Sequence, residues 1–261
     1  NTRKEYSDLV WEIQGELGTS HCYEMGGDYR TKPQYPVGFL GADFTWDRKN
    51  KAYKILRLLK GDSWDKENAN PLEQPGINAK EGDYLVSING QQLTQDLTPH
   101  QALFHLAGQE IEIELRARGA KRATKHPLKT LKMESTLRYR DWVKTNQDFV
   151  NKESQGKIGY IHIPDMGGRG FAEFHRHFLS VYDKDALIVD VRYNGGGHVS
   201  QLLLEKLSRK RNGFCETRWM GRFPAPEESP AGPIVAITNE YAGSDGDIFS
   251  HTFKIVSTLI N

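Results

Sequence analysis

A serine flanked by small residues is the first candidate for chemistry in this sequence. Ser244 lies in the stretch "NEYAGSDGD" (residues 239–247), which follows an apolar segment and precedes a helix-like one. Ala242 and Gly246 stand where the hydrolase nucleophile elbow, G-x-S-x-G, has glycines, because a strained turn leaves no room for larger side chains. The same pattern fits an ordinary helix start, with Ser244 as the N-cap and Asp247 as a first-turn acid. Taken alone, the local pattern favours the helix cap.

A nucleophilic serine also needs a base and hydrogen-bond donors for the oxyanion. Gly195, Gly196 and Gly197 follow a second apolar segment and offer backbone N–H groups without side-chain obstruction. A phosphate-binding loop would need a lysine and a serine or threonine in a fixed order that is absent here, so an oxyanion or substrate-backbone site is favoured. Among nine histidines, His21 has an unusual setting in the polar loop "GELGTSHCYE". Sequence spacing does not show whether His21 approaches Ser244.

The surrounding elements predict an α/β fold. Strand-like segments at residues 156–164 and 185–194 alternate with helix-like segments at 167–182 and 195–210, and residues 232–256 have the pattern of a strand, a turn and a helix. Such alternation predicts a mainly parallel sheet covered by helices on both faces. In sheets of this kind, sites form where strands end and helices begin. Both candidate stretches lie at such junctions.

A separate β-rich unit occupies about residues 34–120. Its segment "PGINAKEGDYLVSINGQQL" resembles the central signature of PDZ domains, and Asn89-Gly90 is a type I′ hairpin signal on physical grounds. PDZ domains hold an extended peptide at a sheet edge, and the loop at residues 37–40 is the candidate for that role here. Alternatively, the unit only spaces or docks the other parts of the chain. The sequence leaves both interpretations open.

Four further segments have local patterns. Residues 111–115 alternate strictly between apolar and acidic side chains, which predicts a half-buried strand. A helix is expected to start after Thr98 and to end at Gly108. The basic segment at residues 116–135 is interpreted as a solvated connector, and residues 1–18 are expected to form a helix rather than a secretory signal.

Composition limits the partners and the compartment. The chain has 261 residues, of which 37% are hydrophobic, and no run approaches the roughly 18 apolar residues of a membrane span. Lys+Arg number 35 and Asp+Glu 34, so a net charge of +1 gives no footprint for nucleic acid or an anionic membrane. Cys22 and Cys215 form neither a disulfide framework nor a zinc signature. We therefore expect a cytoplasmic protein without a metal, cofactor, nucleic-acid partner or membrane partner.

Four stretches in order resemble one known family. "GELGTSHCYE", the PDZ-like unit, "LIVDVRYNGGGHVSQLLLEKL" and "ITNEYAGSDGDIFSHTFK" follow one another as in the C-terminal catalytic half of the tricorn protease family. The resemblance covers about residues 7–254. It implies an N-terminal helical part of the catalytic core at residues 1–33, a PDZ-like domain at 34–120 and the α/β catalytic core at 121–261. Because two β-propellers precede this region in the family, we expect a fragment, a truncated product or a degenerate copy of a longer protein.

The resemblance also implies catalytic roles. Ser244 matches the nucleophile, His21 matches the general base, and Ser20 matches a serine that orients an acidic partner in the charge relay. Asp245 and Gly197 match the donors that stabilise the oxyanion through their backbone N–H groups. The acidic partner in the family is a glutamate on a later strand, which would lie beyond the end of this sequence. Loss of an orienting acid can cost about 10⁴-fold in turnover.

Substrate contacts are implied in the same way. Gly195, Gly196 and Gly197 match contacts to the substrate backbone, and Glu216 is the candidate acid for basic side chains in the first specificity pocket. The expected function is a serine endopeptidase or oligopeptidase that hydrolyses peptides and forms a homo-oligomer in the complete protein. Two alternatives stay open. One is a C-terminal processing peptidase with a serine–lysine dyad, and the other is a catalytically impaired PDZ-type peptide-binding module.

Overall fold

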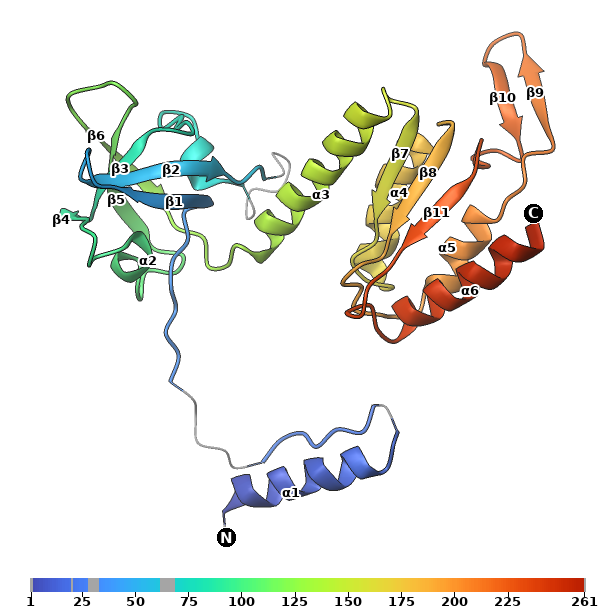
Figure 1. Ribbon diagram of the computed structural model, residues 1–261, viewed down its shortest axis with the longest axis horizontal. Coiled ribbons are helices and arrows are strands. Elements are labelled where there is room, and N and C mark those ends of the chain that lie inside the picture. The colour runs from blue at the N-terminus through green and yellow to red at the C-terminus, as the bar shows by residue number, and fades with distance from the viewer. Residues whose placement is uncertain (1, 20, 28–32, 62–68, 261) are drawn as a thin grey trace. The chain divides into compact units, whose positions relative to one another are not determined.

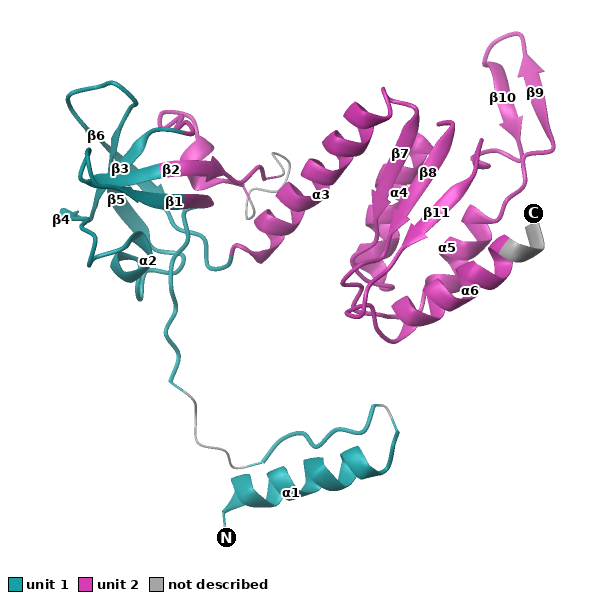
Figure 2. Ribbon diagram, viewed as in Figure 1, with its two compact units in different colours: residues 1–40, 44–54, 82–133 teal, residues 41–43, 55–81, 134–261 magenta. Residues whose placement is uncertain are grey.

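The computed structural model describes residues 2–19, 21–27, 33–61 and 69–260 (Figure 1). The chain divides into two compact units (Figure 2). Unit 1 comprises residues 1–40, 44–54 and 82–133, and unit 2 comprises residues 41–43, 55–81 and 134–261. Within the described ranges, no helix combines the length and the apolar character needed to cross a membrane.

The chain starts with helix α1 (Arg3–Glu16), as its sequence pattern predicts. A capping box fixes its first turn, because the Thr2 hydroxyl accepts the N–H of Glu5 and the Glu5 carboxylate accepts the N–H of Thr2. Leu17 is the C-cap of the helix, and Gly18 follows with a left-handed φ of 61°.

Antiparallel pairs build the sheet that carries the PDZ-like signature. Its strand order is β1-β2-β3-β5-β6, with β4 paired to β3. The elements are Ala42–Asp47 (β1), Ala52–Leu58 (β2), Pro71–Glu73 (η1, a 3-10 helix), Tyr84–Ile88 (β3), Gln91–Gln92 (β4), Glu110–Arg116 (β5) and Thr124–Lys129 (β6). Asn89 and Gly90 both have positive φ, 48° and 76°, and form the predicted turn between β3 and β4. In β5, Ile111 and Ile113 are buried while Glu112 is exposed, which confirms the predicted alternation.

The predicted helix of this unit is shorter than expected. Helix α2 spans only Pro99–Ala102, and Thr98 caps it as predicted. The helix does not continue to Gly108. The carbonyl of Leu103, directly after the helix, accepts the N–H of Gly38 at 2.9 Å and that of Leu106 at 3.1 Å, so it takes part in a tertiary bond and a local turn.

The basic segment at residues 116–135 is more than a connector. It contains strand β6, which pairs with β5 from Thr124 opposite Leu115 to Lys129 opposite Glu110. The sheet therefore continues beyond residue 120. The long helix that follows this segment, α3 (Ser135–Glu153), was not predicted from the sequence.

Unit 2 is built on a three-stranded sheet of order β11-β8-β7. Both outer strands pair with β8 in parallel, as predicted. The elements that follow α3 are Ile158–His162 (β7), Gly168–Val181 (α4), Ala186–Asp190 (β8), Ser200–Leu207 (α5), Gly213–Thr217 (β9), Gly221–Ala225 (β10), Ile234–Ile237 (β11) and Asp245–Ile260 (α6). The antiparallel hairpin β9–β10 was not predicted.

Helices cover both faces of this sheet. Ile161 of β7 belongs to a buried apolar cluster that includes Phe174 of α4 and Phe249 of α6. Alternate residues of β7 point the other way, because Tyr160 and His162 bond side chains of α3. Helices α5 and α6 lie side by side (Figure 1). The layered α/β architecture expected from the sequence is therefore present.

Candidate active site

Ser244 lies in a strained turn between β11 and α6. Its φ is 53°, in the left-handed region that non-glycine residues rarely adopt. An N-cap has an extended backbone and a side chain that accepts an N–H. Here the N–H groups of Asp247 and Ile248 bond the Ser244 carbonyl instead, each at 3.1 Å. The exposed Ser244 hydroxyl has no hydrogen-bond partner among the described residues, so the geometry is that of an elbow rather than a cap.

The glycine turn after β8 packs directly against this elbow. A Cβ atom on Gly196 would lie 2.6 Å from the Ser244 Cβ, a separation that real structures do not show. Gly196 has a φ of 81°, and Gly197 has a φ of 153° and pairs with Met166 in an isolated parallel bridge. Only glycine fits this approach, which explains why the sequence carries glycines there.

The three glycines differ in whether their backbone N–H groups have an acceptor. The N–H of Gly195 donates to the Pro164 carbonyl at 3.2 Å, and the N–H of Gly196 donates to Asn194 Oδ1 at 2.9 Å. Within the part of the chain that the structure describes, the N–H groups of Gly197 and Asp245 have no acceptor. One of these donors is on the residue after Ser244, and the other is in the glycine turn that packs against Ser244. Unused backbone donors of this kind are what an oxyanion hole requires.

The Asp245 side chain is engaged elsewhere. Its carboxylate accepts the Ser200 N–H at 3.0 Å and the Ser200 hydroxyl at 2.5 Å. Because Ser200 is the first residue of α5, this pair joins the starts of α5 and α6. Asp245 is only 9% exposed, so its carboxylate serves the fold and its N–H faces no internal acceptor.

Asn194 is a positioning residue that sequence reasoning missed. It is fully buried, and its Nδ2 donates to the Ile163 carbonyl at 2.8 Å. Its own carbonyl accepts the N–H of Gly243 at 3.1 Å, so one residue connects the end of β7, the glycine turn and the elbow. Gly246 must lack a side chain because a Cβ there would lie 2.5 Å from Asn194 Oδ1. The available signal was the asparagine directly preceding the glycine run.

A buried polar network lies behind the glycine turn. Asp190 is fully buried; burial alone would raise its pKa, but hydrogen bonds from Arg192 and Tyr160 outweigh this effect and lower the pKa below its ordinary value. Burial lowers the pKa of His162, which favours a neutral ring. The His162 Nε2 lies 2.9 Å from the Arg192 carbonyl, which only accepts, so Nε2 carries the proton. This network fixes the backbone that leads into the glycine turn.

The other predicted site residues belong neither to the Ser244 turn nor to the glycine turn of unit 2. His21 belongs to unit 1, has a φ of 63° and is exposed, with its ring edge-on to Tyr23 at 6.2 Å. Ser20 lies outside the described residues. Glu216 is exposed on β9, opposite Arg222 of β10. The pairing of His21 with Ser244 therefore stays a prediction.

The hairpin that carries Glu216 is anchored where the parallel strands begin. At its base, Arg211 forms an ion pair with Asp183, just before β8. Ser244, in contrast, follows the end of β11. Within unit 2, the β9–β10 hairpin and the turn between β11 and α6 thus lie toward opposite ends of the sheet (Figure 1).

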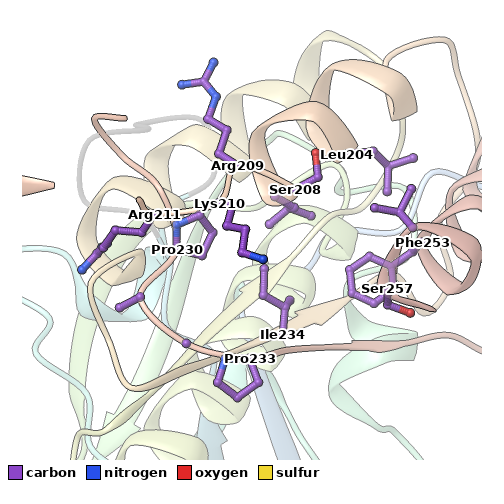
Figure 3. A pocket seen from close by; sticks show the side chains of 14 residues that line it. Leu204, Ser208, Arg209, Lys210, Arg211, Pro230, Pro233, Ile234, Phe253 and Ser257 are labelled. Atoms are coloured by element: carbon purple, nitrogen blue, oxygen red, sulfur yellow. The ribbon is translucent and has the colours of Figure 1, made fainter. Parts of the chain in front are cut away.

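A cavity of about 330 Å³ lies at the strand-start end as well (Figure 3). Leu204 of α5, Phe253 of α6 and Ile234 at the start of β11 form its apolar walls, and the Lys210 side chain extends along it. None of the predicted site residues lines this cavity, so it is separate from the serine turn.

The loop proposed for peptide capture is bonded within unit 1. The N–H of Gly38 donates to the Leu103 carbonyl at 2.9 Å, and the N–H of Phe39 donates to the Leu131 carbonyl at 3.0 Å. Two N–H groups that a PDZ loop would offer to a peptide carboxylate are thus already used. This bonding favours the spacer interpretation of residues 37–40.

Known protein families match two parts of the chain. The tricorn protease PDZ domain matches residues 38–130, and peptidase family S41 matches residues 157–257. A protein described as a tricorn-like protease C-terminal subunit, from Sulfurisphaera tokodaii, is 46% identical over 256 residues, which are 97% of this chain and 29% of that protein. The tricorn protease of Thermoplasma volcanium is 41% identical over 261 residues, covering 99% of this chain and 25% of that protein.

A solved structure agrees with these matches. A crystal structure of the tricorn protease is 40% identical in sequence and has a TM-score of 0.90. The match covers 98% of this chain and 25% of the chain in that crystal structure. The chain thus spans 25–29% of the length of these relatives. Two family matches in the expected order, high coverage of the chain and a shared fold lead to one conclusion. The chain belongs to the tricorn protease family, with a tricorn-type PDZ domain followed by a peptidase family S41 region.

Proposed function

We propose that this chain is the catalytic part of a serine peptidase that hydrolyses peptides or oligopeptides with Ser244 as the nucleophile. In the proposed reaction, His21 removes the proton from the Ser244 hydroxyl, and the oxygen attacks the substrate carbonyl. An acyl-enzyme forms as the amine leaves with that proton, and water then hydrolyses the ester. Ser20 is proposed to orient the acidic partner of the relay.

One observation carries this proposal. Ser244 has a left-handed φ and an unbonded hydroxyl, and the unused N–H groups belong to the next residue, Asp245, and to Gly197 of the glycine turn that packs against Ser244. Donors without internal acceptors are available to the negative oxygen that develops in the transition state. A helix cap, by contrast, would have used the hydroxyl and left no reason for the strain.

Substrate binding follows from the same turn. Gly195, Gly196 and Gly197 are proposed to lie along the substrate backbone, and Glu216 is proposed to read a basic side chain. Because Glu216 stands toward the other end of the sheet, it would have to act on a site of a second copy in a homo-oligomer. A domain boundary at residue 33, a second boundary after β6 instead of at residue 120, and a cytoplasmic location are further parts of the proposal.

Fluorophosphonate labelling tests the nucleophile. The full-length protein is expected to react at Ser244, and Ser244→Ala is expected to lose the label. Ser250→Ala is the matched control, because Ser250 lies on the same helix and its hydroxyl donates to the Gly246 carbonyl at 3.0 Å. Equal labelling of Ser244→Ala and the parent would reject the assignment.

The pH dependence of kcat/KM tests the base. A histidine base predicts an acidic limb in this profile, and His21→Ala should remove the limb together with most of the activity. A serine–lysine dyad, as in the C-terminal processing peptidase alternative, predicts a limb that His21→Ala leaves in place. The second result would replace His21 by a lysine in the mechanism.

A further inference from the structure

A second cavity in unit 2 adjoins the glycine turn and has no part in the steps proposed above. Its volume is about 280 Å³, and its lining includes Tyr139 and Trp142 of α3, Tyr193, His162, Pro164 and Arg169. Two of these residues lead directly to the serine site. The Pro164 carbonyl accepts the N–H of Gly195, and Tyr193 immediately precedes Asn194.

The aromatic walls are fixed by contacts with one another. The Trp142 ring stands edge-on to His162 at 4.8 Å and 88°, and to Tyr193 at 6.3 Å and 78°. The Tyr139 hydroxyl lies 3.2 Å from His162 Nδ1, and the opposite nitrogen of that ring is held by the Arg192 carbonyl. Because His162 is only 2% exposed and bonded at both nitrogens, it forms a rigid floor.

Tyr193 is exposed to solvent and has an uncommon backbone conformation. Its φ is 62°, which is uncommon for a non-glycine residue, and the residue is 60% exposed. Its N–H donates to Asn239 Oδ1 at 3.0 Å, and its ring stacks on Tyr241 at 5.4 Å and 17°. Since Tyr241 precedes Ser244 by three positions in the elbow, the stacked pair extends from the serine turn to the cavity.

Arg169 supplies the charged side chain at the cavity. Its guanidinium lies 4.8 Å from the centroid of the Tyr139 ring. Among the described residues it has no carboxylate partner. A guanidinium in this position can also contact the face of an aromatic ring that enters the cavity.

We propose that the cavity bounded by Tyr139, Trp142 and Tyr193 is a subsite for one aromatic side chain of the peptide substrate. This inference rests on the proposed peptidase function. The volume is just below the roughly 300 Å³ at which pockets hold whole small molecules, so it suits a single side chain. Edge-to-face and offset-stacked contacts with Trp142 and Tyr193 favour a ring over an aliphatic chain.

Peptides that differ at one position test the subsite. In an internally quenched, alanine-rich peptide, phenylalanine is placed in turn at each position on both sides of the cleaved bond. The parent is expected to show at least a tenfold higher kcat/KM for phenylalanine than for alanine at one position. A ring pair contributes about 2- to 13-fold, so Trp142→Ala and Tyr193→Asn should each lower this ratio by several-fold. Asparagine is chosen because it tolerates a positive φ.

The ratio is taken within each variant, so a general loss of folded or active protein cancels. Phe149→Ala is the matched control, because Phe149 lies on the same helix, is 65% exposed and does not line the cavity. The proposal is overturned if no position prefers phenylalanine, or if both variants retain the parental ratio. A preference for aspartate or glutamate that Arg169→Gln abolishes would also overturn it, because the cavity would then recognise a carboxylate.

A binding measurement separates this inference from the proposed function. Calorimetry with Ser244→Ala gives the affinity ratio of the phenylalanine and alanine peptides without turnover. Loss of that ratio in Ser244→Ala/Tyr193→Asn supports the subsite, and an unchanged ratio refutes it. If Ser244→Ala still hydrolyses the peptides, the nucleophile assignment fails, while the phenylalanine-to-alanine ratio of kcat/KM still decides the subsite.

Discussion

Replacing Asn194 by alanine should damage both stability and turnover, because this side chain has two buried hydrogen bonds. Its Oδ1 accepts the N–H of Gly196 at 2.9 Å, and its Nδ2 donates to the Ile163 carbonyl at 2.8 Å. The side chain is fully buried, so water does not replace these bonds without rearrangement. Asn194→Ala therefore leaves one donor and one acceptor without partners.

The magnitude follows from those two groups. Each unsatisfied buried group costs about 1–3 kcal/mol, so the free energy of unfolding should fall by roughly 2–6 kcal/mol. That loss is large beside the ~5–15 kcal/mol of a typical domain. For turnover, the released Gly196 N–H allows the turn to relax and shifts the neighbouring N–H of Gly197. Removing one oxyanion donor lowers kcat by about 10²–10³-fold, which sets the upper limit for Asn194→Ala.

Urea unfolding and steady-state kinetics measure the two effects separately. We expect kcat to fall at least tenfold while KM stays within about threefold, because the proposed oxyanion contact would form only in the transition state. Asn194→Asp keeps an acceptor for Gly196 but opposes an oxygen to the Ile163 carbonyl, so it should give an intermediate loss. The control Asn146→Ala loses one hydrogen bond to the Tyr160 hydroxyl. Its free energy of unfolding should fall by about 1 kcal/mol, and its kcat should not change. A folded Asn194→Ala with parental kcat would refute the positioning role.

Three further predictions follow from neighbouring contacts. Gly196→Ala should abolish turnover in a folded protein, since its Cβ would lie 2.6 Å from that of Ser244; parental activity would contradict the packing. A double-mutant cycle of Asp245→Asn with Ser200→Ala should give a coupling free energy of about 1–3 kcal/mol in thermal unfolding, and zero coupling would contradict their pairing. Burial would raise the pKa of Glu173, but its histidine and arginine partners lower it from 4.5 to about 2. Because the pKa of Glu173 is depressed in the folded state, its ionised carboxylate contributes about 3 kcal/mol of stability above pH 4.5, and this contribution is lost as the pH falls toward 2. In urea unfolding, Glu173→Gln should therefore be less stable than the parent at pH 7 and equally stable near pH 2.

The fold was predictable where the determinants are local. The Asn89-Gly90 turn depends on two residues that accept positive φ, and the β5 alternation depends on neighbouring side chains. Helix α3 lacks such a signal, since Leu137 and Val143 are its only buried apolar residues among those described. It packs through polar side chains instead, as when Asn146 bonds the Tyr160 hydroxyl at 3.2 Å. A period of apolar residues cannot reveal a helix that is held in this way.

The candidate site was predictable in its residue types but not in its geometry. The glycines beside an apolar strand indicated backbone donors, and the small residues around Ser244 indicated a tight turn. Whether the turn caps a helix or exposes a nucleophile depends on the sign of φ at Ser244, which contacts from distant segments determine. The Asn194 carbonyl holds Gly243, and Asp245 reaches Ser200 across 45 positions. No local pattern contains those contacts.

The two unused N–H groups result from how the surrounding donors are distributed. The N–H of Gly195 donates to the Pro164 carbonyl, and the N–H of Gly196 donates to Asn194 Oδ1. The Asp245 carboxylate accepts hydrogen bonds from Ser200. What stays available is the pair of donors on Gly197 and Asp245, beside a serine whose own hydroxyl is also unbonded. The left-handed backbone of Ser244 costs of order 1–3 kcal/mol, and it persists because the surrounding buried bonds fix its neighbours. Stability and preorganisation of the turn therefore depend on the same buried side chains, those of Asn194 and Asp245, and the Ser244 hydroxyl is not among them. Substitutions of Asn194 or Asp245 should impair both folding and turnover, whereas removal of the hydroxyl of Ser244, the proposed nucleophile, should impair turnover alone.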